Sequence, residues 1–144
     1  LNGRVRTIAV VGSNVYVGGA FTGAGGDSNA SYIVRWDGSA WHALGSGLND
    51  EVYAIAVAGP DIYLGGAFTQ TGGGGSVAHI ARWGQDGWHS VGSGLNGRVR
   101  TIAVVGSNVY VGGHFTSAGG DSHASYITRW GGVVYRVFLP LVVR

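Results

Sequence analysis

The sequence contains no cysteine, no methionine and no lysine, and it has only two prolines among its 144 residues. Without cysteine, the chain has no disulfide scaffold, no thiol nucleophile and no thiolate metal site. Nine arginines against seven acidic residues leave a formal charge of +2. So small an excess, with no basic run, argues against a nucleic-acid partner. We therefore expect a protein without a cofactor and without a nucleic-acid ligand.

Glycine, by contrast, is abundant, with 29 residues, while 45% of the chain is hydrophobic and 11% is aromatic. That much glycine is typical of a linker, but disordered chains lack the apolar side chains that offset the entropy lost on ordering. The length is that of one ordinary domain, which buries about two thirds of its unfolded surface. The composition thus predicts a folded chain.

The sequence repeats itself with a period of 47 residues. The three repeats are 1–47, 48–94 and 95–144, and over their first 38 positions the first and third are identical at 33. The second matches the first at 23 of 47 positions, mainly glycine, aromatic and aliphatic ones. A period of this length is typical of solenoids, propellers and other repeat architectures.

Each repeat contains four short segments rich in β-branched and aromatic residues, and none shows helical spacing. In the first repeat we predict strands at Val5–Val11, Val15–Gly19, Tyr32–Trp36 and Trp41–Leu44. The glycine-rich segment Phe21–Ser31 is predicted to be a loop of the length that functional loops often have. Four antiparallel strands in 40 to 50 residues are what a β-propeller blade requires.

The fold class we predict is all-β, a β-propeller with three four-stranded antiparallel blades per chain. The first strand contains Thr7–Val11, which is nearly continuous in apolar residues and so suits a strand buried on both faces. Blades in a ring bury both faces against their neighbours. A β-helix would repeat over far fewer residues, and a sandwich gives no reason for a 47-residue identity.

The glycines and tryptophans of each repeat resemble the double-glycine and paired-aromatic pattern of kelch-type blades. The positions that carry the likeness are Gly18-Gly19, Trp36 and Trp41, repeated as Gly65-Gly66, Trp83 and Trp88. The longer string Tyr16–Thr22, followed by Arg35-Trp36 and Leu44-Gly45, is similar to secreted bacterial propellers and to the propeller of fungal cortical polarity markers. The resemblance implies a blade that serves as a binding scaffold.

Three blades are too few for a closed ring, because propellers close with about four to eight. An open arc would expose a blade face of roughly 300 Å² at each end, and two such apolar faces exceed what soluble monomers leave exposed. We therefore expect the closed ring to form only by oligomerisation, preferably as a homodimer with six blades and alternatively as a homotrimer with nine. The competing interpretation is an engineered or truncated piece of a longer array.

Charged residues at the start of each blade alternate in type along the chain. Arginine pairs stand in the first and third repeats, where the second has acidic and aromatic residues; the positions are Arg4, Arg6, Arg98 and Arg100 against Asp50, Glu51 and Tyr53. This alternation would allow ion pairs between blades. The other interpretation is solvated strand ends, worth well under about 1 kcal/mol each.

The end of the chain departs from the repeat. Tyr135 occupies the position of Trp41, which predicts that the fourth strand persists, and Pro140 is expected to end its pairing. The apolar segment Val133–Arg144 is too short to span a membrane. It resembles the short Leu-Pro-Leu-Val tails of secreted proteins of filamentous Chloroflexi-type bacteria. That likeness implies an extracellular or cell-surface parent protein, whose signal peptide would lie outside this chain.

Catalytic chemistry is sparse in the sequence, and we expect no enzyme. Among the five histidines only His42 and His89 share a repeat position, one blade apart. A metal site needs several converging ligands; His114, Asp121 and His123 could form one, but Ala20 and Asn29 stand at the two histidine positions in the first repeat, so we predict none. No carboxylate pair, Ser-His-Asp order or phosphate loop stands out.

The glycine-rich loops are the remaining candidate for a binding site. They place hydroxyl, amide and carboxylate groups beside an aromatic ring, a set suited to sugars, and repeated weak sites would gain from avidity. The candidate residues are Asp27, Ser28, Asn29, Tyr32, Asp121, Ser122, His123 and Tyr126. The alternative function is therefore an extracellular carbohydrate-binding or protein-binding propeller. Loops that only need to turn are the other interpretation of the same residues.

Overall fold

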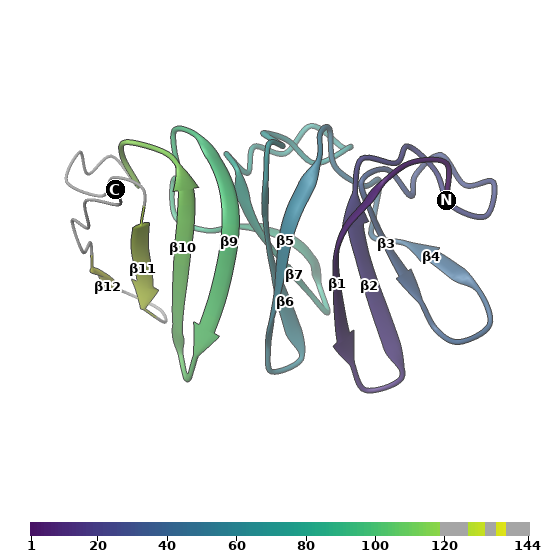
Figure 1. Ribbon diagram of the computed structural model, residues 1–144, viewed down its shortest axis with the longest axis horizontal. Helices are drawn as coiled ribbons and strands as arrows, with labels where there is room; N and C mark the ends of the chain where they lie inside the picture. Colours follow the sequence, from purple (N-terminus) through teal and green to yellow (C-terminus); the bar gives the residue numbers. More distant parts are fainter. Residues whose placement is uncertain (119–126, 132–134, 138–144) are drawn as a thin grey trace.

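The computed structural model describes residues 1–118, 127–131 and 135–137, and these form twelve strands with no helix among them (Figure 1). The prediction of an all-β chain is confirmed. The strands make three antiparallel four-stranded sheets, one in each repeat and each in sequential order. Their bounds are β1 Val5–Val11, β2 Asn14–Gly19, β3 Ile33–Trp36 and β4 Trp41–Ala43; β5 Val52–Ala58, β6 Asp61–Gly66, β7 Ile80–Gly84 and β8 Gly87–Ser90; β9 Arg98–Val105, β10 Asn108–His114, β11 Ile127–Gly131 and β12 Tyr135–Val137.

The predicted strands agree with the structure to within one residue at each end. β3 begins at Ile33 because Tyr32 has a φ of 68°, a left-handed conformation that cannot continue an extended strand. β4 ends at Ala43 because the Leu44 carbonyl accepts a turn hydrogen bond from the Gly47 N–H. The predicted fourth strand at Tyr135 is confirmed by the pairing of β12 with β11, whereas Pro140 lies outside the described residues.

The three sheets stand in a row, with β4 and β12 at its two ends (Figure 1). The first strands meet in the middle of the row, where β5 contacts both β1 and β9. The described strands thus form a row of three sheets and do not close a ring. Across the part of the chain that the structure describes, no helix is long and apolar enough to cross a membrane.

The hydrophobic core lies between neighbouring sheets. We name the face of a sheet that looks toward the next repeat its trailing face, and the face that looks toward the preceding repeat its leading face. One core cluster joins the trailing face of the first sheet, with Tyr16, Ile33 and Leu44, to the leading face of the second, with Val52 and Leu64. A second cluster joins the second and third sheets in the same way. These two clusters are therefore each shared by two neighbouring sheets.

The expectation that the first strand of each blade is buried on both faces is wrong for β1. Ile8 and Val10 of β1 are 60% and 61% exposed, whereas the equivalent Ile55 of β5 packs against the core. The physical reason is that no sheet within the chain precedes the first one. The apolar sequence of β1 is suited to a neighbour that the chain itself does not supply.

Candidate functional site

The starts of the glycine-rich loops are fixed by one asparagine in each repeat. The side chain of Asn2 accepts hydrogen bonds from the Thr22 and Gly23 N–H groups, at 2.9 and 3.1 Å, and its Nδ2 donates to Thr22 Oγ1 at 3.0 Å. The other repeats make the same three bonds, with Asn49 on Thr69 and Gln70 and with Asn96 on Thr116 and Ser117. Sequence reasoning missed these asparagines, although their identity in all three repeats was the available signal.

Two of the predicted sugar-binding residues lie together in the first repeat. Asp27 and Ser28 border a hollow of about 400 Å³ that is also lined by Asn2 and Thr22. The Asp27 carboxylate is already engaged, because its Oδ1 accepts the Asn29 N–H at 2.8 Å. Ser28 offers its carbonyl oxygen to the hydroxyl of Ser31 at 2.7 Å. These two bonds fix the backbone of the loop beside the hollow.

Tyr32 lies apart from that hollow. Its backbone N–H donates to the Phe21 carbonyl at 2.8 Å, and its half-buried side chain packs against the core between the first and second sheets. In the second repeat His79 takes its place, and burial lowers the pKa of the His79 imidazole. The loop of the second repeat also has Gly74 and Gly75 where the first has Asp27 and Ser28. The predicted aromatic and carboxylate partners are thus not brought together in the first two repeats.

The equivalent candidates in the third repeat, Asp121, Ser122, His123 and Tyr126, lie outside the described residues. Within the described part, no three His, Cys, Asp or Glu side chains gather in a way that could hold a metal ion. His114, the part of the considered metal set that is described, is exposed at the end of β10.

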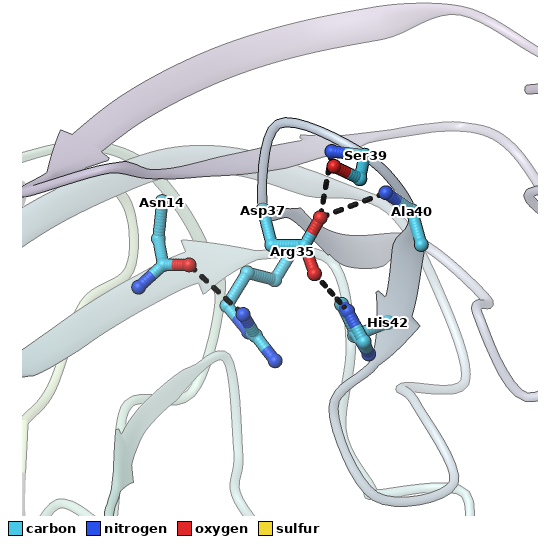
Figure 2. Close-up of polar contacts among 6 residues, drawn as sticks. All are labelled: Asn14, Arg35, Asp37, Ser39, Ala40 and His42. Atoms are coloured by element: carbon cyan, nitrogen blue, oxygen red, sulfur yellow. Dashed lines mark hydrogen bonds and ion pairs between the residues drawn. The ribbon is translucent and has the colours of Figure 1, made fainter.

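Each of the first two sheets carries a histidine–aspartate pair on its last hairpin, which is β3–β4 in the first sheet and β7–β8 in the second. Figure 2 shows Asp37 receiving three contacts, from the Ser39 and Ala40 N–H groups and from His42 Nε2, all at 2.7 Å. The Ala40 N–H is the largest of the influences that hold the pKa of Asp37 well below its usual range, followed by His42. The equivalent His89 instead contacts Asp86 at 2.6 Å, which lowers the pKa of that carboxyl. Both hairpins thus have a histidine–aspartate pair, although the aspartate comes from a different position. We call the first of these pairs, with the Ser39 and Ala40 N–H groups, the Asp37 clamp.

The leading face of the first sheet is apolar and uncovered. It carries Val5, Ile8 and Val10, three of the six large hydrophobic side chains that are exposed among the described residues. Val5 is 44% exposed, whereas the equivalent Val52 and Val99 are fully buried. Val105, on the trailing face of the third sheet, is 63% exposed. Val11, the equivalent of Val105, packs against the core between the first and second sheets, so both ends of the row expose valines whose equivalents are packed within the chain.

Burial at the internal junctions depends on close approach of one backbone to the next sheet. A Cβ on Gly18 would lie 2.6 Å from Val52 Cγ1, and a Cβ on Gly65 would collide with Val99. The double glycines thus leave room for the valine of the following sheet. The indole of Trp88 completes the first junction by donating to the Leu44 carbonyl at 3.1 Å.

Charged side chains cross the same junctions at the first strands. Arg6 Nη2 lies 3.2 Å from Glu51 Oε2, so one of the ion pairs that the alternating charges allow is present. The guanidinium carbons of Arg6 and Arg100 lie 5.7 and 4.7 Å from the centre of the Tyr53 ring. A row of alternating groups therefore runs from the first sheet through the second to the third.

No protein-family model matches the chain, and no curated protein matches it significantly.

Proposed function

We propose that the chain is a non-enzymatic, kelch-like β-propeller piece whose function is self-association into a closed ring that serves as a binding scaffold. Two copies, joined head to tail, would form a six-bladed ring. The leading face of the first sheet in one copy would receive the trailing face of the third sheet in the other. One observation carries this proposal. The valine at one repeat position is fully buried in the second and third repeats, as Val52 and Val99, but it is 44% exposed in the first, as Val5.

The internal junctions supply the template for the contact between copies. Each is made from one trailing face and one leading face, and exposed valines stand at both ends of the row, with Val5 on the leading face of the first sheet and Val105 on the trailing face of the third. The first-sheet cluster of Val17, Phe21 and Val34 is the leading half of such a core without its trailing half. Because burial of apolar area contributes about 25 cal/mol per Å², joining the two faces stabilises the pair. A non-closing contact would instead extend into a filament.

Light scattering in phosphate buffer tests this proposal directly. The chain has a mass of 14.8 kDa, and we expect twice that mass at micromolar concentration. Ile8→Asp, on the exposed leading face, should return the protein to a single chain with its circular dichroism unchanged. Ser13→Asp, in the exposed turn between β1 and β2, adds the same charge away from that face and should leave the mass doubled. A single chain for the parent protein at micromolar concentration would refute the proposal, and a tripled mass would replace six blades by nine.

The second candidate function is a carbohydrate-binding propeller of the cell exterior. The hollow beside Asp27 and Ser28 supports it, because it places a carboxylate and a hydroxyl at one rim of the row. A glycan array on the assembled protein tests this, with Asp27→Ala and Asp121→Ala as the variants. We expect any sugar signal to fall in Asp27→Ala, and the absence of signal from every glycan would refute this candidate.

A further inference from the structure

The first strands of the three sheets share an irregularity that singles out one residue in each. The pairing of β1 with β2 shifts between Val5 and Thr7, that of β5 with β6 between Val52 and Ala54, and that of β9 with β10 at the same place. The residues left out of the pairing are Arg6, Tyr53 and Arg100. A bulge of this kind re-aims the side chain of the extra residue. Here it brings the three side chains together, because both guanidinium groups reach the Tyr53 ring.

Within the chain, this row avoids contact between like charges. At the junction of the first and second sheets, Arg6 meets Glu51 and Tyr53. At the next junction, Tyr53 meets Arg100. The second repeat, which differs most from the others, thus supplies the acid and the ring that separate two pairs of arginines.

A junction between two copies has no such separator. It would place Arg98 and Arg100 of one copy against Arg4 and Arg6 of the next. By the repeat, Arg100 takes the position of Arg6, and Arg4 takes the position of Glu51, which Arg6 contacts at 3.2 Å within the chain. Like charges at that distance repel. Among the described residues, Arg4, Arg98 and Arg100 form no ion pair with an acidic side chain.

We propose that the junction between copies binds a multivalent oxyanion of the phosphate type, held by Arg98 of one copy and Arg4 of the next, with Arg100 and Arg6, which also contact Tyr53 within each chain, beside them. This inference rests on the proposed self-association and adds its regulation. The Glu51 carboxylate marks where negative charge is accommodated at the equivalent internal junction, and its Oε2 is buried there. Guanidinium groups bind such anions through paired N–H donors. Because each copy supplies only half of the site, the anion binds the ring in preference to the single chain and so promotes closure.

The experiment measures mass by light scattering over a range of protein concentrations, in chloride alone and with inorganic pyrophosphate at matched ionic strength. We expect pyrophosphate to lower the concentration for half-association at least tenfold. The double variant Arg98→Glu with Arg100→Tyr copies Glu51 and Tyr53 of the second repeat onto the third. The junction between copies then has the same residues as the junction between the second and third sheets. That variant should associate in chloride and should not respond to pyrophosphate. Arg98→Gln with Arg100→Gln is a milder change that should also lose the response, and Arg35→Gln, at a different arginine, should keep it.

The possible outcomes separate the two proposals. Association of the parent chain that is equally strong with and without pyrophosphate would overturn the anion site and leave self-association intact. A pyrophosphate response that persists in Arg98→Gln with Arg100→Gln would also overturn the site, because the anion would then act elsewhere. A single chain for the parent and both double variants, under every condition, would refute self-association and the anion site together.

Discussion

Trp88 in the second sheet donates its indole N–H to the carbonyl oxygen of Leu44 in the first, at 3.1 Å. The equivalent Trp41 packs at an angle against Trp36 with a ring-centre separation of 4.8 Å, and Trp88 packs against Trp83 at the same separation. The two tryptophans therefore have the same partner within their own sheets. They differ in their contact with a preceding sheet. Trp88 contacts the first sheet, whereas the chain has no sheet before Trp41.

We expect Trp88→Phe to lower the free energy of unfolding by about 1 kcal/mol more than Trp41→Phe does. Both substitutions remove similar volume from a tryptophan pair, but only Trp88→Phe removes a hydrogen bond between sheets, and such a bond contributes about 1 kcal/mol. Urea denaturation at a concentration where light scattering gives a single chain measures the difference. Equal losses for the two variants would mean that the indole bond contributes nothing to the junction.

Gly18 lies close against Val52 across the first junction. A Cβ at Gly18 would lie 2.6 Å from Val52 Cγ1 and 3.0 Å from Thr7 Cγ2, and Val52 is fully buried and has no room to move. We expect Gly18→Ala to destabilise the chain by about 1 to 3 kcal/mol through overpacking.

A double-mutant cycle with Val52→Ala separates this collision from other effects of the alanine. Val52→Ala alone leaves a cavity and should also destabilise the chain. In the combined variant the new methyl group occupies part of that cavity, so the total loss should be smaller than the two single losses added together. Simple additivity, measured by urea denaturation, would show that Gly18 is not required for the approach of Val52.

The sequence predicted the strands well because each depends on local pattern. Val5–Val11 is bounded by a glycine turn and has the residues that strands favour, and it forms β1 with those limits. The conformation of Tyr32 was not predictable, because a φ of 68° in a tyrosine is imposed by the loop that ends there. Burial depended on the place of a repeat in the chain and not on the pattern within one strand. The sequence of β1 from Val5 to Val11 recurs in β9, yet Val5 is exposed and the equivalent Val99 is buried.

The candidate site was harder to predict because its contacts join residues far apart in sequence. Asn2 and Thr22 are twenty residues apart and bond through their side chains, which no local pattern reveals. The row of Arg6, Tyr53 and Arg100 was visible as a charge alternation, but the bulges that bring the side chains together were not. Asp86 likewise replaces Asp37 as the partner of the hairpin histidine from a different position, so alignment of the repeats alone conceals the pair.

The loop of the second repeat offers a further test, because the Asn49 side chain holds its start through three hydrogen bonds. Asn49→Ala removes one donor to Thr69 Oγ1 and the acceptor for two backbone N–H groups. We expect a loss of about 1 to 3 kcal/mol in unfolding free energy, since the two N–H groups lose their partner. Asn49→Asp keeps the acceptor and removes only the donor, so it should cost less than half as much. Thermal unfolding of both variants measures the two losses. Equal losses would mean that only the bond from Asn49 Nδ2 to Thr69 Oγ1 stabilises the loop.

The Asp37 clamp predicts a dependence of stability on acidity. Its folded-state pKa lies well below the ordinary value of 3.8, chiefly because the Ala40 N–H donates to the carboxylate, with His42 as the next cause. A depressed pKa stabilises the fold above the unfolded-state pKa, and this contribution is lost as the pH falls from about 4 toward the folded-state pKa. Asp37→Asn can keep the turn hydrogen bonds but cannot ionise. We therefore expect the parent chain to exceed Asp37→Asn in stability at pH 7, and we expect the difference to narrow steadily below pH 4.

Asp86→Asn is the matched control for that series. His89 is the chief cause that lowers the pKa of the Asp86 carboxyl, followed by the Asp86 backbone N–H, whereas Asp37 accepts the N–H groups of two later residues, Ser39 and Ala40. The gap between the parent and Asp86→Asn should therefore be smaller at pH 7 and should close over the same acid range. Urea denaturation from pH 2.5 to 7 measures both gaps. A gap for Asp37→Asn that stays constant across this range would show that the carboxylate charge does not stabilise the hairpin.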